Sequence, residues 1–410
     1  MPHEPTRETY ERAGVVEKRR IVLLGATGYT GQRVLRGLLA RGEKPTLVGR
    51  NRTKMLAVAD RFGAELAVAE VDVSSMADLT RVMEPGHVVI STVGPFMQLG
   101  MATVTAAAQV GAHYLDSTGE GTFVRRVFEL DAVAAGRGAT LVPAFGYDYV
   151  PGNLAGALAL TRAGERAHRI EIGYFLTRSG HGDELRYRST LRDVFTLSTG
   201  GTRATLVGSA ADDAFAYRRP RPGAPARLVD ERAGKRVRTF RYAGVNRAAM
   251  TVGGSEHLGL PEVFPQLESV DVGLGWFGHW TRPIRTASTL QAPLLRSAKV
   301  RAALKRRSER LPGSQREPDG DGRSLVIAVA RDESGQPLAT TALTGPDPYE
   351  MTASLLAWGA VHMATPDPFL EPGVHGPVAA FGLDTLSLGA AEAGLHEANE
   401  SPAAVHSSTS

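Results

Sequence analysis

The 410-residue sequence contains no cysteine, which excludes disulfides, thiolate metal sites and cysteine nucleophiles. It lacks any run of about 18 apolar residues, the length that a helix needs to cross a bilayer. The first 17 residues are polar and charged, unlike a secretory leader. The histidines show no metal-type spacing such as His-x3-His, so a zinc site is not indicated. These absences predict a cytoplasmic protein without a metal ion.

A glycine-rich loop near residue 25 is the most informative stretch of the sequence. It follows a short apolar run at 21–24, typical of a strand buried on both faces, and a helical pattern follows it. In this context one glycine allows a sharp turn, one allows a pyrophosphate to approach the backbone, and one allows the helix to pack on the sheet. The loop predicts a dinucleotide site, with an ordinary tight turn as the alternative. The candidate contacts are Gly25, Thr27, Gly28, Tyr29, Thr30 and Gly31.

Strands and helices alternate over the first part of the chain. Apolar runs at 46–48, 66–71, 88–90 and 139–142 are separated by helical patterns, and 121–135 is expected to be a single helix. Alternation with short connections predicts an α/β Rossmann fold with a doubly wound parallel sheet. Ligands bind at the carboxyl ends of the strands in such sheets. The polar and glycine-containing segments that follow the strands are therefore expected to converge on one crevice.

The residues that follow the second strand indicate which nicotinamide cofactor the protein binds. An NAD site usually has an acidic residue about 20 residues beyond the glycine loop, whereas an NADP site has an arginine. This sequence has Arg50, Asn51 and Arg52 there and no acid. NADP(H) is therefore favoured over the alternative of a solvated basic turn. Further candidate contacts, for the adenine and the nicotinamide respectively, are Asp72 (or a helix cap) with Val73, and Thr92, Val93, Gly94, Pro95 and Phe96.

Acidic residues after two later strands are the candidate catalytic groups. Asp116 is expected in the wall of the crevice, where a carboxylate can hold or move a proton. The alternative for this loop is that Ser117 or Thr118 caps the following helix and Glu120 complements the dipole of the same helix. Tyr147 and Asp148 form a second candidate acid pair, with a structural turn as the alternative. No tyrosine is followed by a lysine four residues later, which argues against a short-chain dehydrogenase.

The pattern changes near residue 165, where alternating strands and a hairpin signal at 332–335 predict a second α+β domain on a mixed or antiparallel sheet. This domain is expected to cover the nicotinamide, bind substrate and dimerise. The segment 276–310 joins aromatic residues to a basic stretch, which indicates either a solvated helix face or a surface that docks on an anionic membrane or an acidic carrier protein. The expected divisions are a disordered tail at 1–17, a Rossmann domain at 18–164, a second domain at 165–344, C-terminal helices that pack back on the first domain at 345–395, and a disordered tail at 396–410.

Several of these motifs together resemble the saccharopine dehydrogenase-like (saccharopine reductase-type) NADP-binding oxidoreductases, and within them the actinobacterial trans-acting enoyl reductases. Besides the glycine loop, the motifs lie at 113–120, 145–151, 345–349 and 377–382. The likeness is thin at about 205–320. The family usually has Phe-Asp-Ser where this chain has Tyr-Asp-Tyr after residue 146, and Gly-Asp-Pro-Gly-Tyr where it has Pro-Asp-Pro-Tyr after residue 345. Substrate identity is therefore not defined by the resemblance.

The resemblance implies an NADPH-dependent oxidoreductase that reduces an activated C=C bond of an enoyl thioester or of a lipid- or polyketide-type substrate. The substrate would be a small molecule or a carrier-bound acyl group, with an acyl-carrier protein or the membrane surface as a candidate partner. A saccharopine-type imine or amino-acid reductase is the enzyme alternative, and it would bind substrate carboxylates through arginines such as Arg178, Arg186, Arg188 and Arg192. A non-catalytic NADP-binding protein that associates with lipid or a carrier is the alternative of another class. A homodimer is expected, and no nucleic-acid partner, because no recognition motif accompanies the basic charge.

Overall fold

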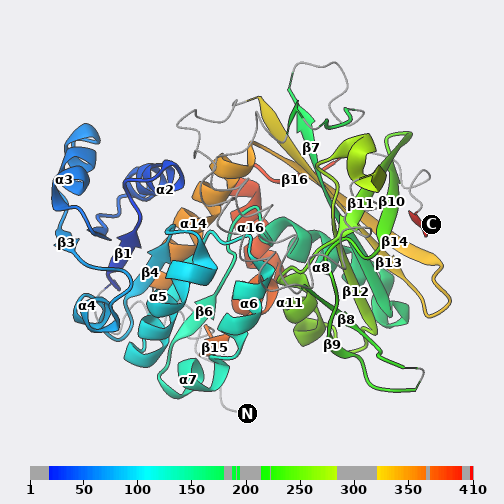
Figure 1. Cartoon of the computed structure of the whole chain (residues 1–410), viewed down its shortest axis with the longest axis horizontal. Helices are drawn as coiled ribbons and strands as arrows, with labels where there is room; N and C mark the ends of the chain where they lie inside the picture. The colour runs from blue at the N-terminus through cyan, green and yellow to red at the C-terminus, as the bar shows by residue number, and fades with distance from the viewer. Residues whose placement is uncertain are drawn as a thin grey trace, which may run out of the picture.

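The structure is a computed structural model that describes residues 18–179, 187–190, 192–193, 214–221, 223–283, 321–365, 370–398 and 407–409. The predicted tail at 1–17 and the basic run at 299–310 lie outside these described residues. Two sheets lie beside each other, the first sheet on the left of Figure 1 and the second sheet on the right. The C-terminal helices α14 (Pro348–Ala364) and α16 (Leu383–Glu392) lie between them.

The first sheet is the predicted doubly wound parallel sheet. Its strand order is β15-β6-β5-β4-β1-β2-β3, and every pair in it is parallel. Strand β1 lies between β2 and β4, so the chain reverses its winding direction there, and the crevice outside the carboxyl end of β1 is the expected ligand site. The strands are β1 (Ile21–Leu24), β2 (Thr46–Gly49), β3 (Val68–Glu70), β4 (Val88–Ser91), β5 (His113–Asp116), β6 (Thr140–Val142) and β15 (Gly373–Val374).

Alternate residues of each strand enter two separate cores, because side chains alternate across a strand. Ile21 and Leu23 pack with α2 and α14 on one face, whereas Val22 and Leu24 pack with α5 and α6 on the other. One predicted helix, 121–135, is wrong as a single element, since α6 ends at Phe128 and α7 begins three residues later. The helices are α2 (Tyr29–Ala40), α3 (Arg52–Arg61), α4 (Met76–Arg81), α5 (Phe96–Val110), α6 (Gly121–Phe128) and α7 (Asp131–Gly136).

The second sheet is mixed, as predicted. Its order is β16-β14-β13-β7-β12-β11-β10-β17, with β7 and β12 parallel, the other pairs along this order antiparallel, and β8 and β9 attached beside β12. The predicted hairpin joins β13 and β14. Helix α8 (Val150–Ala163) contacts β7, β13 and β14. The strands are β7 (Arg169–Arg178), β8 (Phe215–Arg218), β9 (Arg227–Asp230), β10 (Val237–Tyr242), β11 (Val245–Thr251), β12 (Ser269–Leu274), β13 (Gly322–Arg331), β14 (Pro337–Gly345), β16 (His396–Glu397) and β17 (Ser407–Thr409).

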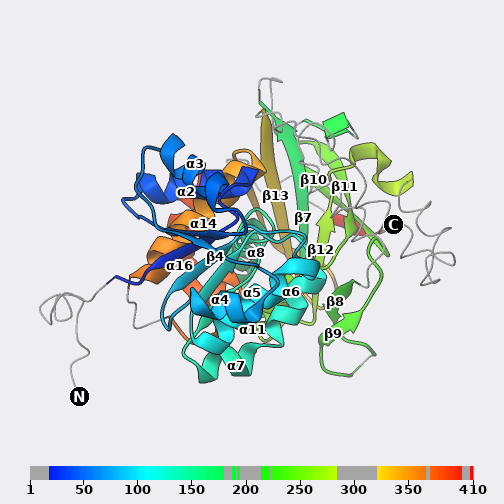
Figure 2. The same cartoon turned by 60° about the vertical axis from the view of Figure 1, so that its left-hand side comes forward.

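The C-terminal part of the chain returns to the first domain. Helix α14 lies alongside α2 and contacts β4 and β5 (Figure 2). Helix α15 (Pro377–Phe381) is separated from α16 by Gly382, whose φ of +74° ends the first of the two helices. The predicted disordered tail at 396–410 is wrong in part, because β16 (His396–Glu397) pairs with β14 and β17 (Ser407–Thr409) pairs with β10.

Candidate functional site at the carboxyl edge of the parallel sheet

The glycine loop at the end of β1 has the tight geometry that the sequence predicts. Gly25 has a φ of +87°, and a Cβ added there would lie 2.5 Å from the Oγ1 of Thr92. A Cβ on Gly31 would lie 2.1 Å from the carbonyl oxygen of Gly25, because helix α2 packs directly on the turn. Any larger side chain at either position would therefore displace backbone. The Gly28 N–H donates to the Gly25 carbonyl at 2.9 Å and closes the loop.

The N-terminus of α2 is open to an anion. Gly28 is its N-cap, so no side chain caps the helix, and no acidic residue lies in its first turn. Backbone N–H groups and the positive end of the helix dipole therefore face the crevice without a competing carboxylate on the helix itself. This arrangement fits the pyrophosphate of a dinucleotide.

The three candidate residues after β2 have different roles in the structure. Arg50 is exposed at the strand end. The Asn51 side chain caps α3 by accepting from the N–H of Lys54 at 2.9 Å, and Arg52 donates to the carbonyl of Val68 at 2.9 Å. Only Arg50 of the three has no structural contact among the interactions found in the described part of the chain, which makes it the residue best placed to bind a 2′-phosphate.

Asp72 lies across the same edge, at the end of β3. Hydrogen bonds from the backbone and side chain of Ser74 lower the pKa of Asp72, and the charge of Arg50 contributes to the same direction. The helix cap of α4 is Ser75 rather than Asp72. Val73 lies next in the chain and packs against the second core. Asp72 therefore stays ionised beside Arg50 at neutral pH.

Hydrogen bonds hold both ends of the loop that follows β4. Thr92 donates through its Oγ1 to the carbonyl of Leu24 at 3.0 Å, which joins this loop to the glycine loop. At the other end, the N–H groups of Phe96 and Met97 donate to the two carboxylate oxygens of Glu120 at 2.8 and 3.0 Å. Between these anchors Val93 is partly buried, while Gly94 and Pro95 are exposed at the edge.

Glu120 thus caps α5, a helix distant from it in sequence. Glu120 was predicted to complement the dipole of α6, the helix that follows it, but its carboxylate binds the N-terminus of α5 instead. Thr118 does not cap α6 either. Thr118 accepts the N–H of Glu120 through its Oγ1 at 3.0 Å. A carboxylate therefore occupies the first N–H groups of α5, whereas the N-terminus of α2 has no side-chain cap.

Asp116 is fully buried and accepts hydrogen bonds from the N–H groups of Thr118 and Ala144, both at 2.9 Å. These bonds tie the segment after β6 to the end of β5. Burial raises the pKa of Asp116 to about 6, opposed by those two hydrogen bonds. The carboxylate is therefore positioned to hold the backbone of the next segment rather than to face the crevice.

That next segment carries Tyr147 and Asp148. The Tyr147 hydroxyl accepts from the indole N–H of Trp276 at 3.2 Å, and burial raises its pKa far above the ordinary value. Asp148 is partly buried, and its Oδ2 lies where a Cβ on Gly119 would approach to 2.7 Å. No hydrogen-bond or ion-pair partner for its carboxylate is found among the described residues, and burial raises its pKa to about 7. Asp148 can therefore hold or release a proton near neutral pH.

Sequence reasoning missed two residues beside Asp148. Glu256, the first residue of α11 (Glu256–Val263), has an exposed fraction of 0%. It accepts the hydroxyl of Tyr174, on β7, at 2.6 Å. Tyr174 lies in a strand that is buried on both faces, and a glutamate in the first turn of a helix is usually a solvated dipole partner. No local signal marks Glu256 as buried.

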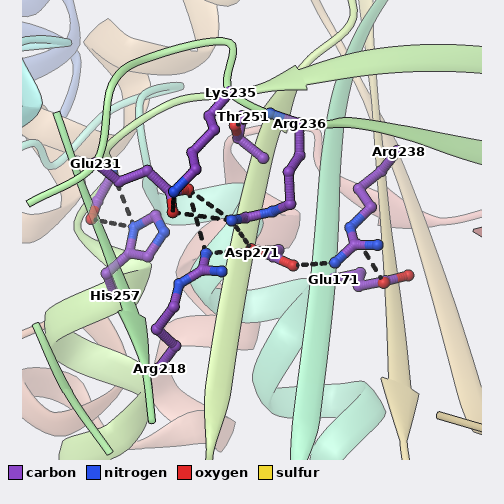
Figure 3. Close-up of polar contacts among 10 residues, drawn as sticks. Glu171, Arg218, Glu231, Lys235, Arg236, Arg238, Thr251, His257 and Asp271 are labelled. Atoms are coloured by element: carbon purple, nitrogen blue, oxygen red, sulfur yellow. Dashed lines mark hydrogen bonds and ion pairs between the residues drawn. The ribbon is translucent and has the colours of Figure 1, made fainter. Parts of the chain in front are cut away.

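A second polar cluster lies within the second sheet and is fully ion-paired (Figure 3). One carboxylate oxygen of Asp271 forms an ion pair with the guanidinium of Arg236, and the other forms one with the guanidinium of Arg238, each at 2.6 Å. Glu231 pairs with Arg236 at 2.8 Å, and Glu171 pairs with Arg331 at 3.0 Å. These contacts join β7, β10, β12 and β13 from within, so this cluster holds the sheet together.

One group of His168, Glu268 and Glu333 brings three ligand-type atoms within 4.8 Å of one another. Arg219 forms an ion pair with Glu268 in that group. A guanidinium already compensates this carboxylate. The group lies before β7 and at the β13–β14 turn, and it has no part in the sheet-edge site.

The part of the chain that forms the parallel sheet is similar to a known family of domains. Residues 21–142 match the family model of the saccharopine dehydrogenase NADP binding domain. The match confirms the predicted NADP(H)-binding domain and the family resemblance that the motifs indicate.

Two curated relatives are similar over part of the chain. A trans-acting enoyl reductase of Mycobacterium ulcerans is 31% identical over 232 residues, which cover 50% of this chain and 55% of that protein. A trans-acting enoyl reductase of Mycobacterium tuberculosis is 34% identical over 140 residues, which cover 33% of this chain and 34% of that protein. The similarity thus spans about half, or less, of the length of these curated relatives.

A solved structure matches the whole architecture. Apo saccharopine dehydrogenase (L-Glu forming) of Saccharomyces cerevisiae aligns with a TM-score of 0.54, covering 96% of this chain and 100% of that one. At 14% identity the likeness shows the fold alone. It confirms the parallel sheet joined to a second, mixed sheet.

Proposed function

From the premise that residues 21–142 are a saccharopine dehydrogenase-type NADP-binding domain, we propose that this chain is an NADPH-dependent reductase of an activated C=C bond, such as that of an enoyl thioester. One observation carries the proposal. The open N-terminus of α2 and the unpaired acid Asp148 belong to one sheet edge, and Thr92, Glu120 and Gly119 connect them through successive contacts. Such an edge can hold a dinucleotide at one end and a proton at the other.

In the proposed reaction, different residues bind the cofactor and supply the proton. The glycine loop and α2 bind the pyrophosphate, Arg50 binds the 2′-phosphate, and the loop from Val93 to Phe96 orients the nicotinamide. When bound, the cofactor would supply the hydride for reduction of the C=C bond. Asp148 supplies the proton: its O–H bond breaks as a C–H bond forms at the carbon next to the carbonyl, and the carboxylate then takes a proton from water.

The surroundings of Asp148 support a C=C substrate over the alternative of an imine or amino acid. Tyr147, Tyr174 and Trp276 form an aromatic group there, with ring centroids 5.5 and 5.9 Å from Tyr147. An amino-acid substrate needs cations for its carboxylates. Arg178 is held by Asp193 at 2.8 Å, Arg188 and Arg192 are exposed, and Arg186 lies outside the described residues.

The proposed substrate is carried by a partner. The names of the relatives, trans-acting enoyl reductases, support an acyl chain presented by another protein. Exposed Trp280, 44% accessible, is one described part of the predicted docking segment, whereas Trp276 is buried in the site. None of the helices described is long and apolar enough to span a membrane. An acidic carrier protein is the proposed partner, a peripheral membrane contact the alternative, and a homodimer the proposed assembly.

The test begins with the cofactor. Fluorescence titration of the full chain should show NADPH bound at least about tenfold more tightly than NADH, roughly 1.4 kcal/mol. Arg50→Ala should abolish that preference, because the 2′-phosphate loses its guanidinium. Arg137→Ala, at the exposed C-cap of α7, serves as the control and should leave it unchanged. NADPH oxidation is then measured with enoyl thioesters and with imines.

Failure to bind either nucleotide would overturn the proposal. Tight binding without oxidation over the whole acceptor panel would favour the non-catalytic alternative, and oxidation only with imines would favour the saccharopine-type enzyme.

A further inference from the structure

Helix α5 begins without a capping side chain of its own. Its N-cap is Pro95, whose side chain makes no cap hydrogen bond. The N–H groups of Phe96 and Met97 instead donate to the two oxygens of the Glu120 carboxylate at 2.8 and 3.0 Å. Such bonds are strong, because they are charge-assisted and because the helix dipole favours a negative charge at this end. The start of α5 is therefore held by a residue that lies 24 positions after Phe96 in the chain.

The segment that carries Glu120 also holds the side chain of Phe96. The ring of Phe96 packs on that of Phe123, in the first turn of α6, with the centroids 5.4 Å apart. A Cβ on Gly100, one turn further along α5, would lie 2.8 Å from the Phe123 ring, so the two helices are in direct contact. A shift of the first turn of α5 would break both the ring contact and the bonds to the carboxylate.

Glu120 is itself held by polar contacts within its own loop. The N–H of Thr118 donates to the carboxylate of Asp116 at 2.9 Å, and the Oγ1 of Thr118 accepts the N–H of Glu120 at 3.0 Å. The Glu120 residue is buried, with an exposed fraction of 9%. Packing and hydrogen bonds therefore leave its carboxylate little freedom to move, and it is a fixed point for α5 rather than a mobile cap.

The loop that joins β11 to α11 holds the Glu120 loop from the other side. The hydroxyl of Tyr149 donates to the carbonyls of Gly119 and Gly253, at 2.8 and 3.1 Å respectively. A Cβ on Gly121 would lie 2.5 Å from the carbonyl oxygen of Gly253. The two backbones are too close for a side chain at this position. Elements that pack with both sheets therefore fix the loop on which Glu120 lies.

Glu120 and Thr92 hold the two ends of one short loop. Thr92 bonds to the last residue of β1 at 3.0 Å, and Glu120 bonds to the first residue of α5. The exposed residues between these anchors are Gly94 and Pro95, which carry no polar side chain that would hold the loop in place. The position of their backbone therefore depends on the two anchors.

We propose that Glu120 is a positioning residue for the nicotinamide: its carboxylate orders the loop from Val93 to Phe96 before the cofactor binds. This inference rests on the proposed function, which assigns contact with the nicotinamide to that loop. The Glu120 loop also lies against the proposed acid, since a Cβ on Gly119 would lie 2.7 Å from the Oδ2 of Asp148. Glu120 thus fixes the nicotinamide loop relative to Asp148 as well.

The two ends of the cofactor depend on Glu120 to different degrees in this proposal. The oxygens of its carboxylate bind the start of α5, whereas the phosphates are assigned to the N-terminus of α2 and to Arg50. Loss of the carboxylate should therefore weaken the contacts of the nicotinamide and leave those of the adenosine end intact. A ligand that lacks the nicotinamide distinguishes this effect from a general loss of structure.

The experiment measures the binding of two ligands to the full chain by isothermal titration calorimetry. NADPH contains the nicotinamide, and adenosine 2′,5′-bisphosphate is the other end of the cofactor without it. In Glu120→Ala we expect NADPH to bind about tenfold more weakly, because binding must then order a loop that is ordered in advance in the parent. The affinity for adenosine 2′,5′-bisphosphate should not change.

Glu120→Gln is the conservative variant. Its amide oxygen still accepts one N–H group of α5, but its NH2 group faces the other, so we expect a loss of NADPH affinity of about threefold. With an enoyl thioester as acceptor, kcat in Glu120→Ala should fall by about 100-fold, more than the affinity for NADPH, because a small misplacement of the nicotinamide slows hydride transfer.

Asp131→Ala is the matched control. The Asp131 carboxylate also accepts the N–H of a residue distant in sequence, Val374, at 2.9 Å, but it does so at the edge strand β15. This variant loses a comparable hydrogen bond of the same sheet. It should bind both ligands as the parent does and keep the parent kcat.

Unchanged NADPH binding in the Glu120 variants, or equal weakening of both ligands, would overturn the role of Glu120, and the proposed function would stand as long as the parent reduces the acceptor. If Glu120→Ala does not fold, the same comparison in Glu120→Gln decides. Binding of NADPH by the parent without turnover would overturn the proposed function, and the two ligands would then decide the inference by themselves. Absence of NADPH binding in the parent would overturn both.

Discussion

Two buried acids, Asp271 and Glu256, have opposite environments. Asp271 is buried like Glu256, but Arg236 and Arg238 bind both of its oxygens. Burial alone would raise the pKa of Asp271, yet these arginines lower it, whereas the pKa of Glu256 rises to about 8. A buried carboxylate with counter-ions stays charged and joins strands. A buried carboxyl without them becomes a proton store at neutral pH.

The largest expected effect comes from breaking the paired group. Asp271→Asn leaves three arginines, Arg218, Arg236 and Arg238, facing a neutral amide, and we expect a loss of about 3–5 kcal/mol in the free energy of unfolding. Urea unfolding measures it. Asp230→Asn, which loses an ion pair with Arg125 at a side chain that is 76% exposed, should cost less than about 1 kcal/mol. Equal losses in the two variants would contradict a structural role for the buried network.

A smaller effect is expected from filling the space beside the unpaired group. The methyl group of Gly152→Ala would lie 2.1 Å from the Tyr174 hydroxyl oxygen and 2.2 Å from Glu256 Oε1. We expect a loss of about 1–3 kcal/mol from overpacking, together with loss of the high-pH fall in stability. Gly136→Ala is the control, since nothing lies within 4 Å of its added Cβ. A variant as stable as the control would show that the two groups do not need this space.

The smallest expected effect is a difference in how the stability contributed by the two groups depends on pH. The lowered pKa of Asp271 means that its stabilisation is present above an unfolded pKa of about 3.9 and is lost as pH falls through the lower folded value. The unpaired acids act at the other end, above about pH 7. A plot of Tm against pH from pH 3 to pH 9 should therefore fall at both its acid end and its alkaline end. Asp271→Asn should reduce only the fall at the acid end. A smaller fall at the alkaline end in that variant would show that the groups are not independent.

The sheet-edge site was predictable where local patterns decide it. The glycine loop, the buried strand before it and the basic residue Arg50 after the second strand each follow from spacing and residue type, and the fold places them as expected. Glu120 was assigned to the wrong helix because a capping pattern is local, whereas its carboxylate reaches the first N–H groups of α5. Asn51 and Arg52, which are also predicted to bind cofactor, have structural contacts that the sequence did not indicate: Asn51 caps α3 and Arg52 donates to the carbonyl of Val68.

The sequence by itself determined the doubly wound sheet, the class of cofactor and the strand ends where Asp116 and Asp148 lie, because hydrophobic period, glycine spacing and charge are properties of short segments. Only the tertiary structure decided which acid is neutralised by arginines and which is not. The pKa of a buried carboxyl depends on neighbours that come from distant elements, β7, α8 and α11 for Glu256 and β10 for Asp271. No window of sequence contains those neighbours together.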